Sequence, residues 1–193
     1  MKLKSDFYCG DDVVAIAQLL LGKVVFTCKN NLITAGIITE TEAYNGITDR
    51  ASHAFGGKRT SRTSVMYQQG GVAYIYLCYG VHSLLNVVTN VENIPHAVLI
   101  RSVLPFEGEE TMLQRRKQII YTKKSFHGPG KVSQALGIDY SLTGTSLFGN
   151  KIWIEDKGIS FRPEQIKVTP RIGVDYAGSD ALLPYRFLID EFH

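Results

Sequence analysis

The sequence of 193 residues carries a formal net charge of +3, with 45% hydrophobic and 20% charged residues. This composition excludes a histone-like basic tail and is typical of a soluble globular protein, most simply a single domain over residues 1–193. No apolar run reaches the length of a membrane span, so we expect no contact with a membrane. The N-terminal stretch MKLKSDFYCGDD lacks the apolar segment of a signal peptide, which predicts a cytoplasmic or nuclear protein.

The three cysteines and five histidines show neither a disulfide framework nor the spacing of a metal site. Cys9, Cys28 and Cys78 are odd in number and lie far apart, which predicts free thiols in a reducing compartment. The histidines form neither an HExxH motif nor a close pair. We therefore expect no metal ion and no cofactor.

The first part of the chain predicts a helix, two strands and a long loop. Asp11 can cap a helix that ends at Gly22. The segments KVVFTC and ITAGIITETEAY are rich in strand-forming residues, which predicts strands at 23–28 and 33–44, joined by a turn at KNN. Residues 45–71 hold few apolar side chains, so we expect a long surface loop that is functional or mobile.

The rest of the chain predicts mainly strands, with two helices among them. Strands are expected up to Gly80, through Leu85–Val88, and in the segments HAVLIRSVLP, KIWIED, IKVTPRIGV and YRFLID. The segments GEETMLQRRKQI and GPGKVSQALGI predict helices, the second beginning near Pro129 and ending at Gly137. Since short turns rather than helical crossovers join most strands, the sequence predicts an α+β domain with a mainly antiparallel sheet.

Two carboxylates and an aromatic ring occupy alternate positions of the second predicted strand. Successive side chains of a strand point to opposite faces, so Ile38, Glu40, Glu42 and Tyr44 are predicted to share a face. A buried glutamate beside aromatic rings has a raised pKa and can act as a general base. Paired glutamates more often lie on a solvated edge, and the sequence alone leaves that alternative open. Glu42 is the better candidate because it lies nearer to the polar segment that begins at Gly46.

Tyrosines are concentrated between residues 44 and 79. They are Tyr44, Tyr67, Tyr74, Tyr76 and Tyr79. Tyrosines at strand spacing are most often core or cross-strand pairs, but they can also form a stacking platform for nucleic-acid bases. The basic residues Lys58, Arg59 and Arg62 directly precede most of them, which favours nucleic-acid binding.

Two further features allow both a functional and an ordinary interpretation. His53 lies in the same polar segment, and a lone histidine usually has no special role. The stretch HGPGK, which ends at Lys131, opens a predicted helix and is either an anion-binding site or a simple turn. It does not match the GxxxxGK[ST] pattern of a nucleotide-binding loop.

Seven motifs give the chain a close resemblance to the alkyladenine (3-methyladenine, or methylpurine) DNA glycosylase family. They occur in the family's order and cover nearly the whole chain: ETEAYNG, ASHAFGG, AYIYLCYG with Asn86 downstream, VLIRSVLPFEGEETM, GPGKVSQALGI, PRIGVDYAG and PYRFLI. The resemblance implies a curved, mainly antiparallel sheet flanked by helices, with a protruding hairpin that intercalates into DNA. It implies a monofunctional enzyme that flips a damaged purine out of the duplex, hydrolyses its N-glycosidic bond and leaves an abasic site. The implied substrates are of the 3-methyladenine, 7-methylguanine, hypoxanthine and ethenoadenine class.

Matching positions in these motifs imply a role for each site residue. Glu42 would activate the water, which Arg101 and the backbone carbonyl of Ile172 would hold, while Glu40 would give support without taking part in the chemistry. The substrate pocket would include Tyr44, Ala51, His53, Tyr76 and Asn86. Tyr79 would fill the hole left in the helix, and further DNA contacts would come from Lys58, Arg59, Arg62, Val81 and Lys131. The implied partner is double-stranded DNA with damaged purines, bound by a monomer, at the nucleoid of a bacterium or in a nucleus.

The chain departs from the family pattern at two places. Family members often carry methionine two residues after the wedge tyrosine, where this chain has Val81, and Ser64 replaces a basic residue. A second class of function therefore stays open, a catalytically weak damaged-DNA-binding module of the same fold. Action on RNA or free nucleosides is a further alternative, against which the Tyr79 wedge argues. A purely structural role would explain neither the pocket residues nor the motif order.

Overall fold

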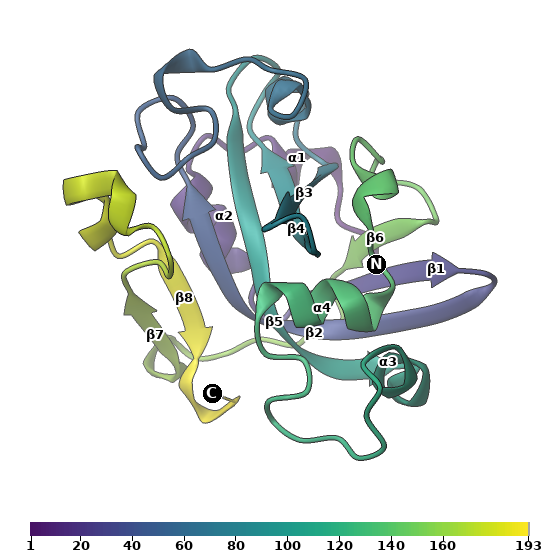
Figure 1. Ribbon diagram of the computed structural model, residues 1–193. Helices are drawn as coiled ribbons and strands as arrows, with labels where there is room; N and C mark the ends of the chain where they lie inside the picture. Colours follow the sequence, from purple (N-terminus) through teal and green to yellow (C-terminus); the bar gives the residue numbers. More distant parts are fainter. Residues whose placement is uncertain (193) are drawn as a thin grey trace.

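The computed structural model describes residues 1–192, in which eight strands form one curved sheet (Figure 1). The strands are β1 (Val24–Lys29), β2 (Leu32–Tyr44), β3 (Val72–Cys78), β4 (His82–Thr89), β5 (His96–Glu107), β6 (Ile152–Glu155), β7 (Ile166–Thr169) and β8 (Arg186–Ile189). Hydrogen-bonded neighbours follow the order β3-β4-β5-β2-β1-β6, and β8 pairs with both β2 and β7. The pairings between these strands are antiparallel, which confirms the predicted α+β class.

Within the described part of the chain, four short α-helices accompany the sheet. They are α1 (Ser5–Tyr8), α2 (Val13–Leu19), α3 (Glu109–Arg115) and α4 (Pro129–Leu136). Single 3-10 segments lie at η1 (Phe55–Gly57), η2 (Ser64–Tyr67), η3 (Tyr140–Leu142), η4 (Pro163–Gln165), η5 (Asp175–Leu182) and η6 (Asp190–Phe192). In Figure 1, α4 lies in front of the sheet over β4 and β5, while α2 packs behind β2. Within residues 1–192, none of these helices has both the length and the apolarity to span a bilayer.

The boundaries of α4 follow local signals, whereas those of α2 and α3 differ from the prediction; α2 ends at Leu19 and not at Gly22. Pro129 is the first residue of α4 and Gly137 ends it in a left-handed conformation, both as predicted. In contrast, α3 stops at Arg115, several residues before the predicted end. Its chain turns at Lys117, whose φ of 54° is incompatible with a continued helix.

Strand β2 is the centre of the sheet and changes its partner along its length. One edge pairs with β5, while the other pairs first with β1 and then, from Glu40 to Glu42, with β8. The register with β5 shifts on both sides of Glu40, as at a β-bulge. Because of this shift, Ile38 packs in the same core cluster as Ala43. The prediction that Ile38 shares a face with Glu42 is therefore wrong, whereas Glu40 and Glu42 both reach Arg101.

Alternating residues of β4 and β5 separate the core from a pocket. The residues that pack in the main core are Leu85, Val87, Val98 and Ile100. The residues between them line the pocket: Leu84, Asn86, Leu99 and Arg101. Successive side chains of a strand point to opposite faces, which explains why a polar Asn and Arg interrupt otherwise apolar strands.

The segment 45–71 is packed more closely against the sheet than its sequence predicts. Its apolar residues Val65, Met66 and Tyr67 are buried and form a second core cluster with Tyr74 of β3. The two 3-10 segments η1 and η2 bring these few apolar side chains to one side. The segment therefore forms a wall of the pocket, with its basic residues on the outside.

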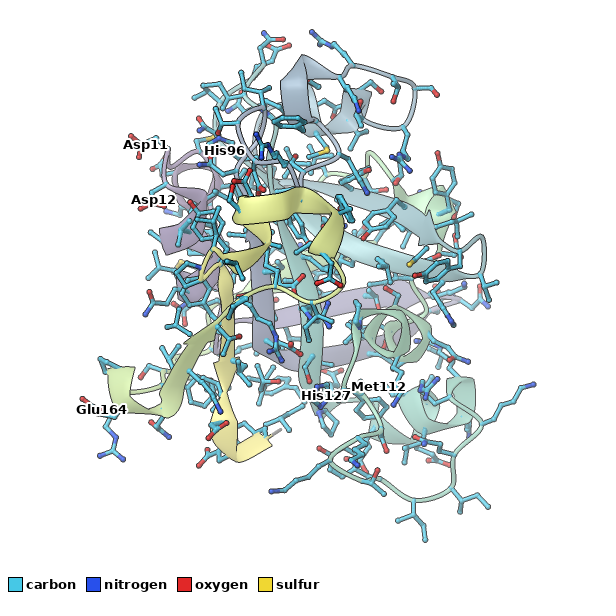
Figure 2. All side chains as sticks on the ribbon, turned by 60° about the vertical axis from the view of Figure 1, so that its left-hand side comes forward. Asp11, Asp12, His96, Met112, His127 and Glu164 are labelled. Atoms are coloured by element: carbon cyan, nitrogen blue, oxygen red, sulfur yellow. The ribbon has the colours of Figure 1, made fainter. Side chains whose placement is uncertain are left out.

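Asp12, and not the predicted Asp11, caps the first turn of α2. The Oδ1 atom of Asp12 accepts hydrogen bonds from the backbone N–H of Val14 at 2.8 Å and of Ala15 at 3.0 Å. Both aspartates are exposed at the start of the helix (Figure 2). An N-cap side chain binds the N–H groups two and three residues ahead, and α2 begins at Val13, so only Asp12 has the correct offset.

This capping geometry predicts different effects for the two aspartates. Asp12→Ala should lower the free energy of unfolding by about 1 kcal/mol, because two N–H groups of the first turn lose their acceptor. The matched Asp11→Ala variant should change the stability by less than half as much. Urea denaturation of both variants measures the difference, and equal losses would show that the cap does not stabilise the helix.

Candidate active site

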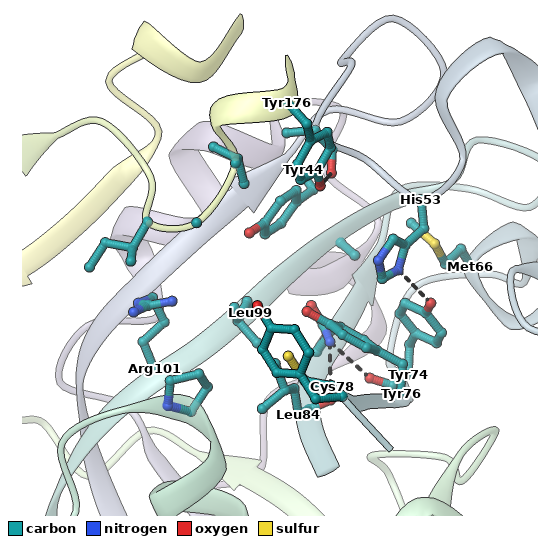
Figure 3. Close-up of a pocket in the computed structure, with 18 residues that line it drawn as sticks. Tyr44, His53, Met66, Tyr74, Tyr76, Cys78, Leu84, Leu99, Arg101 and Tyr176 are labelled. Atoms are coloured by element: carbon teal, nitrogen blue, oxygen red, sulfur yellow. Dashed lines mark hydrogen bonds between the residues drawn. The ribbon is translucent and has the colours of Figure 1, made fainter. Parts of the chain in front are cut away.

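A pocket of about 250 Å³ lies where β2–β5 meet the turn at residues 172–176 (Figure 3). Its aromatic members are Tyr44, His53, Tyr74, Tyr76, Tyr79 and Tyr176. The volume is slightly below the ~300–1,000 Å³ of sites for drug-sized ligands, so the pocket suits one flat ring system. Its lining combines these rings with a few polar groups, which is the usual composition of a site that orients a ligand.

The structure brings most of the predicted site residues to this pocket. The predicted residues that line it are Tyr44, Ala51, His53, Tyr76, Tyr79, Asn86, Arg101 and Ile172. Glu42 lies directly behind the wall that Tyr44, Arg101 and Ile172 form. The predicted DNA-contacting residues lie outside the pocket: Lys58, Arg59, Arg62, Val81 and Lys131. Residues 1–192 contain no group of three or more His, Cys, Asp and Glu side chains arranged to hold a metal ion.

The carboxylate of Glu42 is completely buried and is contacted by three groups. Its Oε1 accepts a hydrogen bond from the backbone N–H of Ile172 at 2.8 Å and lies 3.4 Å from Nε of Arg101. Its Oε2 accepts a hydrogen bond from the hydroxyl of Tyr44 at 2.8 Å. The alternative of a solvated edge is therefore wrong, since Glu42 has 0% of its surface exposed. The N–H of Ile172 adds a contact that the motif resemblance did not imply.

Burial disfavours the negative charge of Glu42, whereas the neighbouring donors stabilise it. Burial raises the pKa of Glu42, while Arg101, the Ile172 N–H and the Tyr44 hydroxyl lower it. Burial also raises the pKa of Tyr44, so this hydroxyl keeps its proton and remains a donor. A carboxylate whose charge is only partly compensated retains the ability to accept a proton, as a general base must.

Arg171, which no sequence pattern indicated, is a further buried residue in contact with the site. It is buried and forms an ion pair with Asp49, and it also donates to the backbone carbonyls of Ala43 and Asp180. Its guanidinium lies 4.9 Å from the centre of the Tyr44 ring. Arg171 therefore fixes both the ring of Tyr44 and the turn that carries the next residue. The residue lies in the motif PRIGVDYAG, but no periodicity distinguishes it from a surface arginine.

The opposite side of the pocket is formed by three rings in contact. Nδ1 of His53 is 2.8 Å from the hydroxyl of Tyr74, and its ring meets the edge of Tyr76 with centroids 4.5 Å apart. Burial, followed by the nearby charge of Arg62, lowers the pKa of His53 from 6.5 to about 4. His53 is therefore neutral at physiological pH. Tyr74, which the sequence analysis treated as one of several tyrosines, is the residue that orients it.

Asn86 has both a structural partner and a place in the pocket. Its Nδ2 donates to the backbone carbonyls of Tyr74 and Leu84, each at 3.2 Å (Figure 3). The side chain is buried and lines the pocket between β3 and β5. Asn86 therefore satisfies backbone groups of the sheet and also lines the pocket.

The hairpin of β3 and β4 carries the most exposed ring of the pocket. Tyr79 is 94% exposed at the tip of the hairpin and has a φ of 52°. Val81, two residues later, is also exposed. A left-handed backbone is uncommon and strained for a tyrosine, which makes the hairpin tip a candidate contact site.

The basic residues around the pocket differ in whether their charged groups already bind other groups of the protein. Lys58 and Arg62 are exposed on the segment before β3. Arg59 lies over the ring of Tyr67 at 4.8 Å and donates to Asn93, so it is partly used within the protein. Lys131, in the first turn of α4, donates to the backbone carbonyl of Lys124 at 3.2 Å.

Comparison of the sequence with known proteins identifies the family to which the chain is related. The family described as Methylpurine-DNA glycosylase (MPG) matches residues 6–192. The chain is 46% identical over 191 residues to a protein of Chlamydia pneumoniae, covering 97% of this chain and 94% of that protein. It is 41% identical over 203 residues to a protein of Desulfitobacterium hafniense (strain Y51), covering 98% and 96%. Both relatives bear the name "Putative 3-methyladenine DNA glycosylase".

The chain therefore belongs to the methylpurine-DNA glycosylase family. It is a monofunctional DNA glycosylase, that is, a hydrolase of N-glycosidic bonds in base excision repair. The curved antiparallel sheet and the aromatic pocket with a buried carboxylate are the structural counterparts of this assignment.

The environment of His53 predicts a pH dependence of stability. Its pKa in the folded protein, about 4, lies below its ordinary value of 6.5. The unfolded chain therefore takes up this proton first as the pH falls. The contribution to stability should be complete above pH 6.5 and should be lost progressively as the pH falls to about 4. Unfolding free energies across this range should fall more steeply for the wild type than for His53→Gln, which cannot titrate; equal slopes would contradict the prediction.

Proposed function

We propose that the pocket receives an alkylated or deaminated purine flipped out of duplex DNA, and that Glu42 activates the water that releases it. The observation that carries this proposal is the buried carboxylate of Glu42, held by Tyr44, Arg101 and the Ile172 N–H directly behind an aromatic pocket. A target bond inside the base stack cannot be reached, so the nucleotide must leave the duplex first. The whole chain then acts as one catalytic domain and needs no second copy.

In this mechanism Glu42 serves as the general base. Departure of the base leaves an oxocarbenium-like sugar, which the negative charge of Glu42 stabilises while its carboxylate accepts a proton from water. The water oxygen forms the new bond to the sugar carbon, and the electron pair of the broken bond leaves with the purine. Arg101 and the backbone carbonyl of Ile172 position the water. The three contacts of Glu42 support this role, because they orient the carboxylate before the reaction begins.

The aromatic walls suit bases that carry a positive charge. Tyr44, His53 and Tyr76 present electron-rich rings, and a cationic purine such as 3-methyladenine or 7-methylguanine stacks well between such rings. A neutral His53 does not repel this charge. Ala51 has no bulky side chain and leaves room for the base. Hypoxanthine and ethenoadenine are neutral, so their excision would depend on shape and hydrogen bonding.

The DNA duplex is bound by the exposed groups around the pocket. Tyr79 enters the base stack and fills the position of the flipped nucleotide, with Val81 beside it. Lys58, Arg62 and Lys131 bind phosphates, which positions the duplex without reading its sequence. Arg59 contributes less than its charge suggests, because Tyr67 and Asn93 already hold it.

Replacement of Glu42 tests the proposed function directly. Glu42→Gln should keep lesion binding but slow base release about 10²–10⁴-fold, the usual loss when a general base is removed. Chromatography of bases released from alkylated duplexes measures the rate. Glu164→Gln, at an exposed glutamate of η4 that does not line the pocket (Figure 2), is the control and should behave as the wild type. Near-normal turnover by Glu42→Gln would show that another residue is the general base. Absence of base release by the wild type would instead favour a DNA-binding module without catalysis.

Replacement of Tyr79 tests the intercalating role of the hairpin. Tyr79→Ala should mainly impair flipping, because the ring offsets a few kcal/mol of lost base stacking. A lesion opposite its normal partner should therefore lose more activity than the same lesion in a loose mismatch, where less stacking must be broken. Single-turnover base release from the two duplexes provides the comparison. Equal losses on both would leave Tyr79 as an ordinary residue at a strand end.

Replacement of Asn86 tests how normal guanine is rejected. Guanine carries a 2-amino group that adenine and hypoxanthine lack, and a side chain against that edge of the base excludes it by steric conflict. Asn86→Ser should raise guanine excision while hypoxanthine excision stays within a few-fold. Because Asn86 also binds the carbonyls of Tyr74 and Leu84, thermal unfolding of the variant must be measured as well. A parallel loss of both activities would make Asn86 purely structural.

A further inference from the structure

A second buried carboxylate lies behind Glu42 on the same strand. Glu40 has no exposed surface, and its Oε1 accepts hydrogen bonds from Nε of Arg101 at 3.0 Å and from Nε of Arg186 at 2.6 Å. Its Oε2 lies 3.6 Å from Nε2 of His127, in the loop before α4. One carboxylate therefore joins side chains from β5, β8 and the loop before α4.

Arg101 is shared unequally between the two glutamates. The same Nε atom lies 3.0 Å from Glu40 and 3.4 Å from Glu42. The hydrogen bond therefore belongs to Glu40, while Glu42 takes part only in a longer ion pair. As a result, Arg101 stays at the pocket wall without neutralising Glu42 completely (Figure 3).

Glu40 is also linked to the turn that completes the site. Arg186 holds Glu40 through Nε and donates from NH1 to the hydroxyl of Thr169 at 3.2 Å. Thr169 is the last residue of β7, and the turn that follows it carries Ile172, whose N–H binds Glu42. The same carboxylate thus anchors two of the three groups that contact Glu42.

We propose that Glu40 is the positioning residue of the active site: it holds Arg101 and, through Arg186, the Ile172 turn, and so keeps Glu42 free to act as the base. This proposal rests on the proposed function of Glu42. Glu40 does not touch the reacting atoms, so it acts only through its neighbours. The alternative is a buried ion pair that stabilises the fold and has no effect on the chemistry.

The two roles differ in what they do to the charge of Glu42. The charged or titratable groups that act on Glu42 are Glu40, Arg101, Arg171, Tyr44, Tyr76 and Tyr176. Those that face Glu40 are Arg101, Arg186, His127 and Glu42. Loss of the negative charge of Glu40 frees Arg101 to pair fully with Glu42, which lowers the pKa of Glu42 and weakens it as a base. Loss of the positive charge of Arg186 acts in the opposite direction.

The test is the pH profile of single-turnover base release by folded variants. Glu40→Gln should lower the plateau rate about 10- to 100-fold, as expected for a misplaced catalytic group. It should also move the acid limb of the profile, the pH range in which the rate rises as Glu42 loses its proton, to lower pH by about one unit. This is the usual effect of a stronger ion pair. Arg186→Gln should move the acid limb to higher pH. Asp190→Asn, an exposed residue that follows β8 directly, is the control and should leave the profile unchanged.

A double variant covers the case in which Glu40→Gln does not fold. Glu40→Gln leaves two partly buried guanidinium groups without their negative partner, whereas Glu40→Gln with Arg186→Gln removes one of these positive charges as well. The acid limb of the double variant should lie below that of Arg186→Gln alone, and its plateau should stay low.

The outcomes separate this inference from the proposed function. If the folded Glu40 variants keep the wild-type plateau rate and an unmoved acid limb, Glu40 is only part of a structural ion pair. An unmoved acid limb in Arg186→Gln would also overturn the proposal. In both cases an inactive Glu42→Gln variant would leave the proposed function intact. An active Glu42→Gln variant would instead overturn the proposed function, whatever the Glu40 variants show.

Discussion

A carboxylate without exposed surface must receive hydrogen bonds, or burial will hold it in its neutral form, and the geometry around Glu42 follows from this constraint. Its contacts come from β2 itself, from β5 and from the turn after β7. The donors are themselves held, Tyr44 by the guanidinium of Arg171 and Arg101 by Glu40. The candidate active site is therefore the pocket-facing end of a network of buried charges that ties the central strands to β7 and β8.

The pocket on the other side of this network depends on rings that stay uncharged. Burial keeps His53 neutral and keeps the protons on Tyr44 and Tyr76. The contact between His53 and Tyr74 fixes the imidazole without giving it a charge. Under the proposed function, a cationic base would thus meet polarisable surfaces on its faces and a negative charge only near the sugar. This separation directs the electrostatic stabilisation to the bond that breaks.

The sequence predicted what local rules decide. Alternation placed Glu42 and Tyr44 on one face, and Pro129 and Gly137 marked α4, because each depends on neighbours within a few residues. Ile38 did not follow the alternation, since the bulge arises where β2 changes its partner from β1 to β8. Arg171 was missed because its partner Asp49 lies 122 residues away in the chain. The roles given to Arg101 and Ile172 came from motif resemblance alone; the structure adds their contacts with Glu42, and Arg101 gains Glu40 as a partner that no local pattern predicts.

Strand β8 pairs with the middle of the sheet although it lies at the far end of the described chain. It meets β2 at Glu40 to Glu42, after more than a hundred intervening residues. During synthesis on a ribosome, a nascent chain without β7 and β8 lacks Arg186 and the Ile172 turn, and therefore the hydrogen bonds that these give to Glu40 and Glu42. Pairing between such distant segments also forms late and slowly. Under the proposed function, completion of the polypeptide is thus a precondition for catalysis, and truncated products of translation would have no competence to cleave bases from the genome.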